Sequence, residues 1–223
     1  MMSSVATLVV EKPLLRGWLH ALAAPFALFG LVVLILLTRH DPLKLISVTI
    51  YGVCLFLLFA VSATYHIPSW SPRLRTWWRR ADHGMIFLII AATYTPLVFN
   101  ILGGPLRVVI LVSIWVFALI GILGAAPFLH AHRRLFASFY LAMGWLSVIA
   151  LAPLTAALGL GAAVLLAFGG LQYSLGAAFY AFRKPKLWPR VFSYHELFHA
   201  ATLTAAATFF VIILVYAVPY HRP

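Results

Sequence analysis

The chain has 223 residues, of which 64% are apolar and 9% are charged, and its mean hydropathy is +1.03. Soluble globular domains are only about 45–50% apolar, so this composition excludes an ordinary soluble protein and indicates an integral membrane protein. The net charge is +12, and the one cysteine, Cys54, cannot form an intrachain disulfide.

Seven apolar stretches follow one another, most of them near the length of about 20 residues that a helix needs to cross a bilayer. We place the predicted spans at 17–37, 43–65, 84–102, 106–126, 135–152, 158–182 and 191–218. Pro25 and Gly30 interrupt the first stretch, but membrane helices tolerate both residues when neighbours satisfy the freed backbone groups. We therefore expect one all-α domain over residues 1–223, a seven-transmembrane-helix bundle, with residues 1–16 as a cytoplasmic tail.

The basic residues divide unequally between the two sides of such a bundle. One side receives four of the 16, namely Arg39, Lys44, Arg107 and Arg222. The other receives the remaining twelve, namely Lys12, Arg16, Arg73, Arg75, Arg79, Arg80, Arg133, Arg134, Arg183, Lys184, Lys186 and Arg190. Basic residues gather on the cytoplasmic side of membrane proteins, so the N-terminus is predicted inside and the C-terminus outside. Topology and anionic lipid headgroups account for the charge, and no nucleic-acid partner is expected.

Two of the four carboxylates, Asp82 and Glu196, lie near the ends of predicted spans. Ionisable groups at membrane depth are rare, face the interior of the bundle and mark functional sites. His195 and His199 stand four residues apart at the start of the seventh span. That spacing places both rings on one helix face, where they can hold a single ion.

A catalytic zinc usually has three protein ligands, so two histidines make an incomplete site. His66 ends the second span, which returns to the cytoplasmic side where the seventh span begins. Asp82 opens the third span at the same level. Because three distant segments deliver such residues to one layer, we predict a metal site there with His66 as the third ligand.

Structural alternatives remain for each of these residues. His195 and His199 could join helices by hydrogen bonds, and Asp82 could pair with a neighbouring arginine or favour a helix start. Ser62, four residues before His66, could bond to the carbonyl one turn earlier in its own helix. The remaining histidines look like residues of loops or span ends, and we assign no role to His20, His40, His130, His132 and His221.

Four motifs resemble those of the hemolysin III family, the bacterial branch of the progestin and adipoQ receptor family, related more distantly to the alkaline ceramidases. They are Ser-Ala-Thr-Tyr-His at 62–66, Arg-Ala-Asp-His-Gly at 80–84, Ala-Ala-Thr-Tyr-Thr-Pro at 91–96 and Tyr-His-Glu-Leu-Phe-His at 194–199. The resemblance implies zinc held by His66, His195 and His199, with Asp82 contacting a zinc-bound water and Ser62 matching the serine of the same motif. It also implies a cytoplasmic N-terminus and an outer C-terminus.

Our leading hypothesis is a zinc-dependent hydrolase that cleaves a ceramide-like lipid amide in the inner leaflet of a bacterial cell membrane. Asp82 would orient or deprotonate the water, and Ser62 would help to stabilise the oxyanion. Glu196 is a second candidate base, by analogy with soluble proteases that carry the same His-Glu-x-x-His string. Two alternatives stay open, a membrane sensor with structural zinc and a pore-forming cytolysin. The oligomeric state is not indicated.

Overall fold

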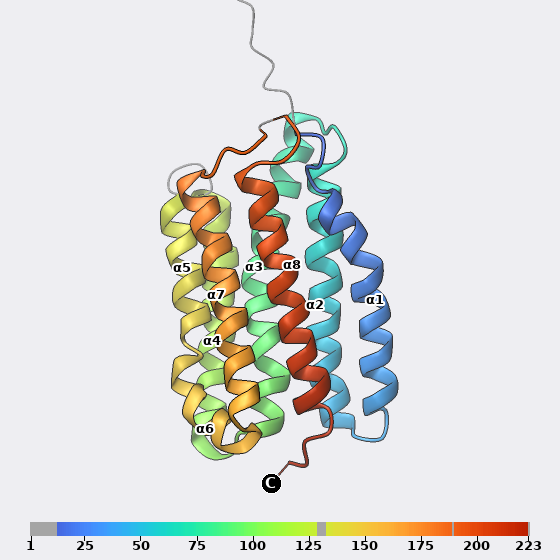
Figure 1. Ribbon diagram of the computed structural model, residues 1–223, viewed down its shortest axis with the longest axis vertical. Coiled ribbons are helices and arrows are strands. Elements are labelled where there is room, and N and C mark those ends of the chain that lie inside the picture. The colour runs from blue at the N-terminus through green and yellow to red at the C-terminus, as the bar shows by residue number, and fades with distance from the viewer. Residues whose placement is uncertain (1–12, 129–132, 189, 223) are drawn as a thin grey trace, which may run out of the picture.

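The computed structural model describes residues 13–128, 133–188 and 190–222, which form an elongated bundle of helices (Figure 1). Seven of the helical segments are long and apolar enough to cross a membrane. The prediction of an all-α bundle with seven spans is therefore confirmed. Lys12, which the charge count includes, lies outside the described residues, as do Glu11, His130 and His132.

The first four spans are single helices: α1 (Trp18–Thr38), α2 (Pro42–His66), α3 (Pro72–Ile101) and α4 (Gly104–Phe128). The fifth is made of two pieces, α5 (Arg133–Trp145) and α6 (Val148–Leu158). The sixth is α7 (Leu160–Phe182), and the seventh is α8 (Tyr194–Ile212), which continues into the short π-helix Ile213–Ala217.

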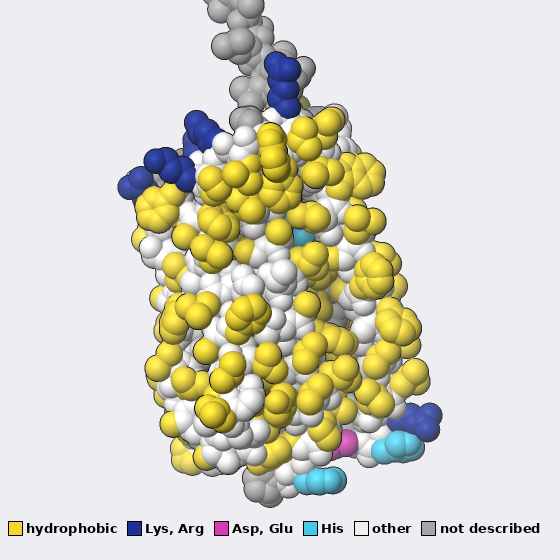
Figure 2. Space-filling view, in the orientation of Figure 1, with side chains coloured by type: hydrophobic (Ala, Val, Ile, Leu, Met, Phe, Trp, Pro, Cys, Tyr) yellow, Lys and Arg dark blue, Asp and Glu magenta, His cyan; other side chains and the backbone are white. Residues whose placement is uncertain are grey.

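The third span forms the centre of the bundle. In its most apolar window, 78% of the residues of α3 are buried, against 22% for α4. Large apolar side chains cover the outer surface along the length of the bundle, while charged side chains lie near its two ends (Figure 2). Such an exterior is what a bilayer solvates, and the core holds the side chains that lipid does not reach.

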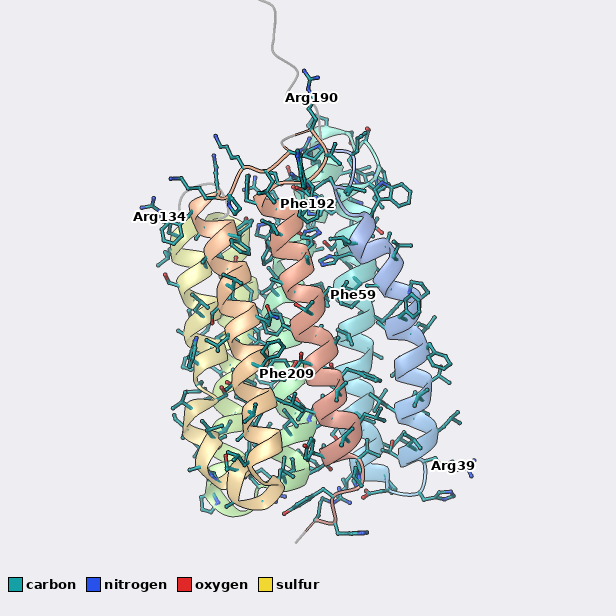
Figure 3. The ribbon with its side chains drawn as sticks, viewed as in Figure 1. Arg39, Phe59, Arg134, Arg190, Phe192 and Phe209 are labelled. Carbon is teal, nitrogen blue, oxygen red and sulfur yellow. The ribbon has the colours of Figure 1, made fainter. Side chains whose placement is uncertain are left out.

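The two ends of the bundle differ in charge. Arg134 and Arg190 lie at one end, which we call the basic end, and Arg39 lies at the other (Figure 3). The first described residues lie at the basic end and the C-terminus at the opposite end (Figure 1). This separation agrees with the uneven distribution of arginine and lysine. That the basic end faces the cytoplasm stays a prediction.

Two elements differ from the predicted ones. Helix α3 begins at Pro72, whereas the predicted span begins at residue 84. Its first turns carry arginines, and hydropathy does not distinguish such a solvated helical extension from a loop. As a result, Asp82 lies about three turns inside α3 and not at its start.

The fifth span is broken between α5 and α6, which the sequence pattern did not predict. The N–H of Ser147 donates to the carbonyl of Gly144 at 3.3 Å, so the carbonyl of Met143 loses this helical partner. The hydroxyl of Tyr94 on α3 lies 2.9 Å and 2.8 Å from the carbonyl oxygens of Met143 and Gly144. A neighbouring helix thus supplies the hydrogen bond that the break would otherwise leave unmade, as membrane helices require.

Candidate metal centre

Local sequence places three histidines at helix ends near the basic end. His66 is the last residue of α2: Ile67 still donates its N–H to the carbonyl of Ala63, but Pro68, which follows, has no N–H with which to continue the helix. Helix α8 begins at Tyr194, because Ser193 and Glu196 form a reciprocal capping box. His195 and His199 therefore occupy the first two turns of α8 and share one face.

The structure brings these three imidazoles together. One ring nitrogen from each lies within 4.8 Å of the others, and the Nε2 atoms of His66 and His195 are 3.2 Å apart. Two nitrogens bound tetrahedrally to one zinc at about 2.0–2.1 Å lie about 3.3 Å from each other. His66 and His199 are buried, and His195 is partly buried. The three residues fit a metal such as zinc, a borderline-soft ion that imidazole nitrogen suits.

Asp82 and Ser62 lie next to the histidines. The Oδ2 atom of Asp82 is 3.8 Å from Nε2 of His66, and 14% of the Asp82 side chain is exposed. Ser62, one turn before His66 on α2, is buried and lines the same end of the cavity as Asp82. A carboxylate and a hydroxyl therefore stand beside the three-histidine cluster.

His83 and Tyr180 border the carboxylate on the side of α7. The Nε2 atom of His83 lies 3.0 Å from the hydroxyl of Tyr180, and its Nδ1 atom lies 2.9 Å from the carbonyl of Arg79. Nδ1 of His83 is also 3.7 Å from Oδ2 of Asp82. These contacts connect α3 to α7 at the level of the cluster.

Glu196 faces away from the cluster. One carboxylate oxygen accepts from the backbone N–H of Ser193 at 2.8 Å, and the other pairs with Nε of Arg16. The side chain is 1% exposed, so these partners enclose it. Its place in the structure is that of a helix cap and anchor, which does not favour its role as the second candidate base.

His20 is the residue that sequence reasoning missed. It was expected at a span end without a role, but it is 3% exposed and its ring stacks on that of His199. The centroids of the two rings are 4.0 Å apart and their planes differ by 4°. A histidine three residues into an apolar span was the available signal, since an ionisable side chain at that depth usually faces the bundle interior.

A cavity of about 260 Å³ ends on this group of residues. Ser62, Asp82, His20 and His199 line one end, and the rest of the wall is mostly apolar side chains of α3, the broken fifth span, α7 and α8. Along α3 the lining extends from Asp82 to Val98, about 24 Å at 1.5 Å per residue. Phe209 of α8 lies well below the cluster and also lines the cavity (Figure 3).

The fold and the site together define a class: multi-pass membrane proteins with a buried three-histidine cluster at the end of an apolar cavity. Comparison with known proteins then identifies the family. The sequence model described as "Haemolysin-III related" matches residues 8–210, and the chain belongs to this family.

Three relatives show the breadth of the similarity. The chain is 32% identical to Hemolysin-3 of Bacillus cereus over 96% of its own length and 95% of that protein. It is 32% identical to the human monocyte to macrophage differentiation factor over 82% of the chain and 74% of that protein. It is 33% identical to the rice heptahelical transmembrane protein ADIPOR2 over 69% of the chain and 74% of that protein. The similarity thus extends to eukaryotic proteins, one of which is named as heptahelical.

Proposed function

We propose that the protein is a zinc-dependent hydrolase of membrane lipids that carry an amide bond, a ceramide-like class. The observation that carries this proposal is the apolar cavity that ends on Asp82, Ser62 and a buried histidine of the three-histidine cluster. An apolar cleft with a few convergent polar groups is the usual form of a small-molecule site.

His66, His195 and His199 would hold the metal. Zinc bound there would polarise the amide carbonyl and lower the pKa of a water molecule to about 7. Asp82 would accept a proton from the attacking water and return it to the leaving nitrogen, the general acid and base role that a positioned carboxylate performs. Ser62, which lines the cavity beside Asp82, would offer its hydroxyl to the developing oxyanion.

The dimensions of the cavity support an acyl-chain substrate. Its length of about 24 Å exceeds the roughly 15 Å that one leaflet contributes to a hydrocarbon core of about 30 Å. An extended acyl chain can therefore lie inside the bundle while its polar head meets the cluster. A conducting path would show rings of polar or charged side chains, which this mostly apolar wall does not resemble, so the cavity favours a lipid over a pore.

The bundle would lie in the membrane in one orientation. The basic end would face the cytoplasm, which places the cluster at the inner leaflet of a bacterial cell membrane. The similarity to a Bacillus cereus protein supports a bacterial membrane.

The test is release of fatty acid from a panel of lipid amides, including ceramides, by purified protein loaded with zinc. The wild type should release fatty acid, and Asp82→Asn should lower the rate by about 10²–10⁴-fold, the usual contribution of general acid and base catalysis. Zinc content should stay the same in that variant, since the metal ligands are intact. Asp41→Asn, a matched change of a half-buried carboxylate at the opposite end, should keep full activity. Equal rates for Asp82→Asn and wild type would contradict the proposal.

A further inference from the structure

His20 lies inside the bundle and not at its surface. It is the third residue of α1 and is 3% exposed. Together with Ser62, Asp82 and His199, it lines the end of the cavity beside the metal cluster. The mechanism proposed above gives this histidine no task.

Packing fixes the position of the His20 ring. One face stacks on His199, and Phe59 lies 5.0 Å away between ring centroids. The beginning of α1 is held to the site in two further ways. The side chain of Arg16 pairs with Glu196 of α8, and Gly17 fits against His66 so closely that a Cβ atom there would lie 2.7 Å from the Cβ of His66.

Within the described part of the chain, the His20 ring nitrogens make no hydrogen bond. Neither Nδ1 nor Nε2 of His20 has a hydrogen-bond partner among the described residues, although both atoms are buried. The backbone of His199 lies near the ring but does not reach hydrogen-bond geometry. A neutral imidazole carries one donor and one acceptor, and proteins rarely bury such groups unpaired. An unpaired, buried ring at a cavity wall therefore indicates a ligand that supplies the partner.

His20 is poorly placed to be a fourth metal ligand. The lone pair of an imidazole nitrogen lies in the plane of its ring. The planes of His20 and His199 are nearly parallel, at 4°, with their centroids 4.0 Å apart. An ion held in the plane of His199 thus lies off the plane of His20, where the lone pair of His20 does not point.

We propose that His20 is a substrate-binding residue whose ring N–H donates a hydrogen bond to the head oxygen of a lipid in the cavity. The oxygen belongs to the amide of a substrate or to the carboxyl group of a released fatty acid. The inference rests on the proposed function for this chemical class. It does not rest on turnover, because a fatty acid can bind to a protein that hydrolyses nothing.

The test measures equilibrium binding of radiolabelled oleic acid to detergent-purified, zinc-loaded protein. His20→Phe keeps an aromatic ring against His199 but removes both nitrogens, so it should weaken oleic acid binding about tenfold, the loss of one hydrogen bond. His20→Gln removes the ring but keeps an N–H donor, so it should bind within about threefold of wild type. His221→Phe, an exposed histidine near the C-terminus, should bind like wild type.

A role limited to stacking predicts the reverse order, with His20→Phe close to wild type and His20→Gln impaired. That order would overturn the proposal, as would loss of zinc in His20→Phe or absence of oleic acid binding in the wild type. If His20→Phe does not fold, His20→Leu, which also removes both ring nitrogens, should weaken oleic acid binding to the same extent. Carboxyl-¹³C oleic acid gives an independent readout, because its infrared carbonyl band should shift between wild type and His20→Phe but not between wild type and His221→Phe.

The two proposals fail in different ways. Oleic acid binding that depends on His20, without release of fatty acid from any lipid amide, would support the role of His20 and contradict the hydrolase. Hydrolysis that depends on Asp82, with oleic acid binding unchanged in His20→Phe, would support the hydrolase and contradict the role of His20.

Discussion

Glu196 stands between His195 and His199 in the sequence, but its side chain lies on a different face of α8. Successive residues of an α-helix are rotated by about 100°, so the neighbour of His195 points to a different face. Its carboxylate caps α8 through Ser193 and holds α1 through Arg16. The same string of letters that carries a base in soluble zinc proteases is therefore used here to join two helices.

One substitution distinguishes a structural role of Glu196, as helix cap and anchor, from a role as catalytic base. Glu196→Gln should lower the free energy of unfolding by about 1–3 kcal/mol, because a buried partner of Arg16 loses its charge. Zinc content should remain unchanged, since no metal contact is removed. Thermal unfolding and metal analysis of the purified variant check this. Loss of hydrolysis with unchanged stability would instead identify Glu196 as a catalytic base.

At the scale of elements, the start of α1 is part of the site. Gly17 has φ of +86°, a left-handed conformation that glycine adopts without a steric penalty, and it lies against His66. A side chain at position 17 would strain the backbone and collide with His66, so the start of α1 or the end of α2 would have to shift. A glycine there lets the first helix approach the three-histidine cluster closely.

The chain provides a matched pair of glycines to test this contact. Gly17→Ala should weaken zinc binding by about 10–100-fold, the effect of disturbing a group that orients a ligand. Gly104 also has a positive φ, +61°, but a Cβ atom there would meet nothing within 4 Å. Gly104→Ala should therefore lower the free energy of unfolding by about 1–2 kcal/mol, because its backbone is strained, and should leave zinc binding unchanged. Equal zinc affinities in the two variants, measured by competition with a chelator, would contradict the role of Gly17.

Tyr94 of α3 contacts the break in the fifth span. Tyr94→Phe removes the hydroxyl that meets the carbonyl oxygens of Met143 and Gly144. The carbonyl of Gly144 keeps the N–H of Ser147, but the carbonyl of Met143 loses the Tyr94 hydroxyl, which should lower stability by about 1–3 kcal/mol. A thermal unfolding curve in detergent, with circular dichroism as the probe, measures the effect. A midpoint equal to that of wild type would show that the carbonyl of Met143 finds another partner.

At the scale of the whole molecule, the basic end should face the cytoplasm. Cysteine labelling in intact cells tests this, in a background where Cys54→Ala removes the native thiol. Arg39→Cys should react with a membrane-impermeant maleimide, because Arg39 is exposed at the end opposite the basic end. Arg134→Cys, exposed at the basic end, should react only after the cells are made permeable. Labelling of Arg134→Cys in intact cells, with Arg39→Cys protected until the cells are made permeable, would show that the basic end faces outward.

The sequence was sufficient for the bundle and for the group of residues around His66, because both depend on strong one-dimensional signals. Apolar runs of membrane length define the spans, and the spacing of His195 and His199 defines a helix face. The length of α3 and the break before Ser147 were not predictable in the same way, since they depend on solvated turns and on a partner from another helix. His20 was missed because its burial follows from how α1 packs, which hydropathy does not report.

The central claim is that His66, His195 and His199 hold one metal ion, and metal analysis by mass spectrometry tests it most directly. Detergent-purified protein, washed with a weak chelator, should contain about one zinc per chain. His66→Ala and His195→Ala should each lose it, while the control Asp41→Asn should retain it. Absence of stoichiometric metal from the wild type would contradict the account, and the clustered histidines would then form a hydrogen-bonded polar layer between helices.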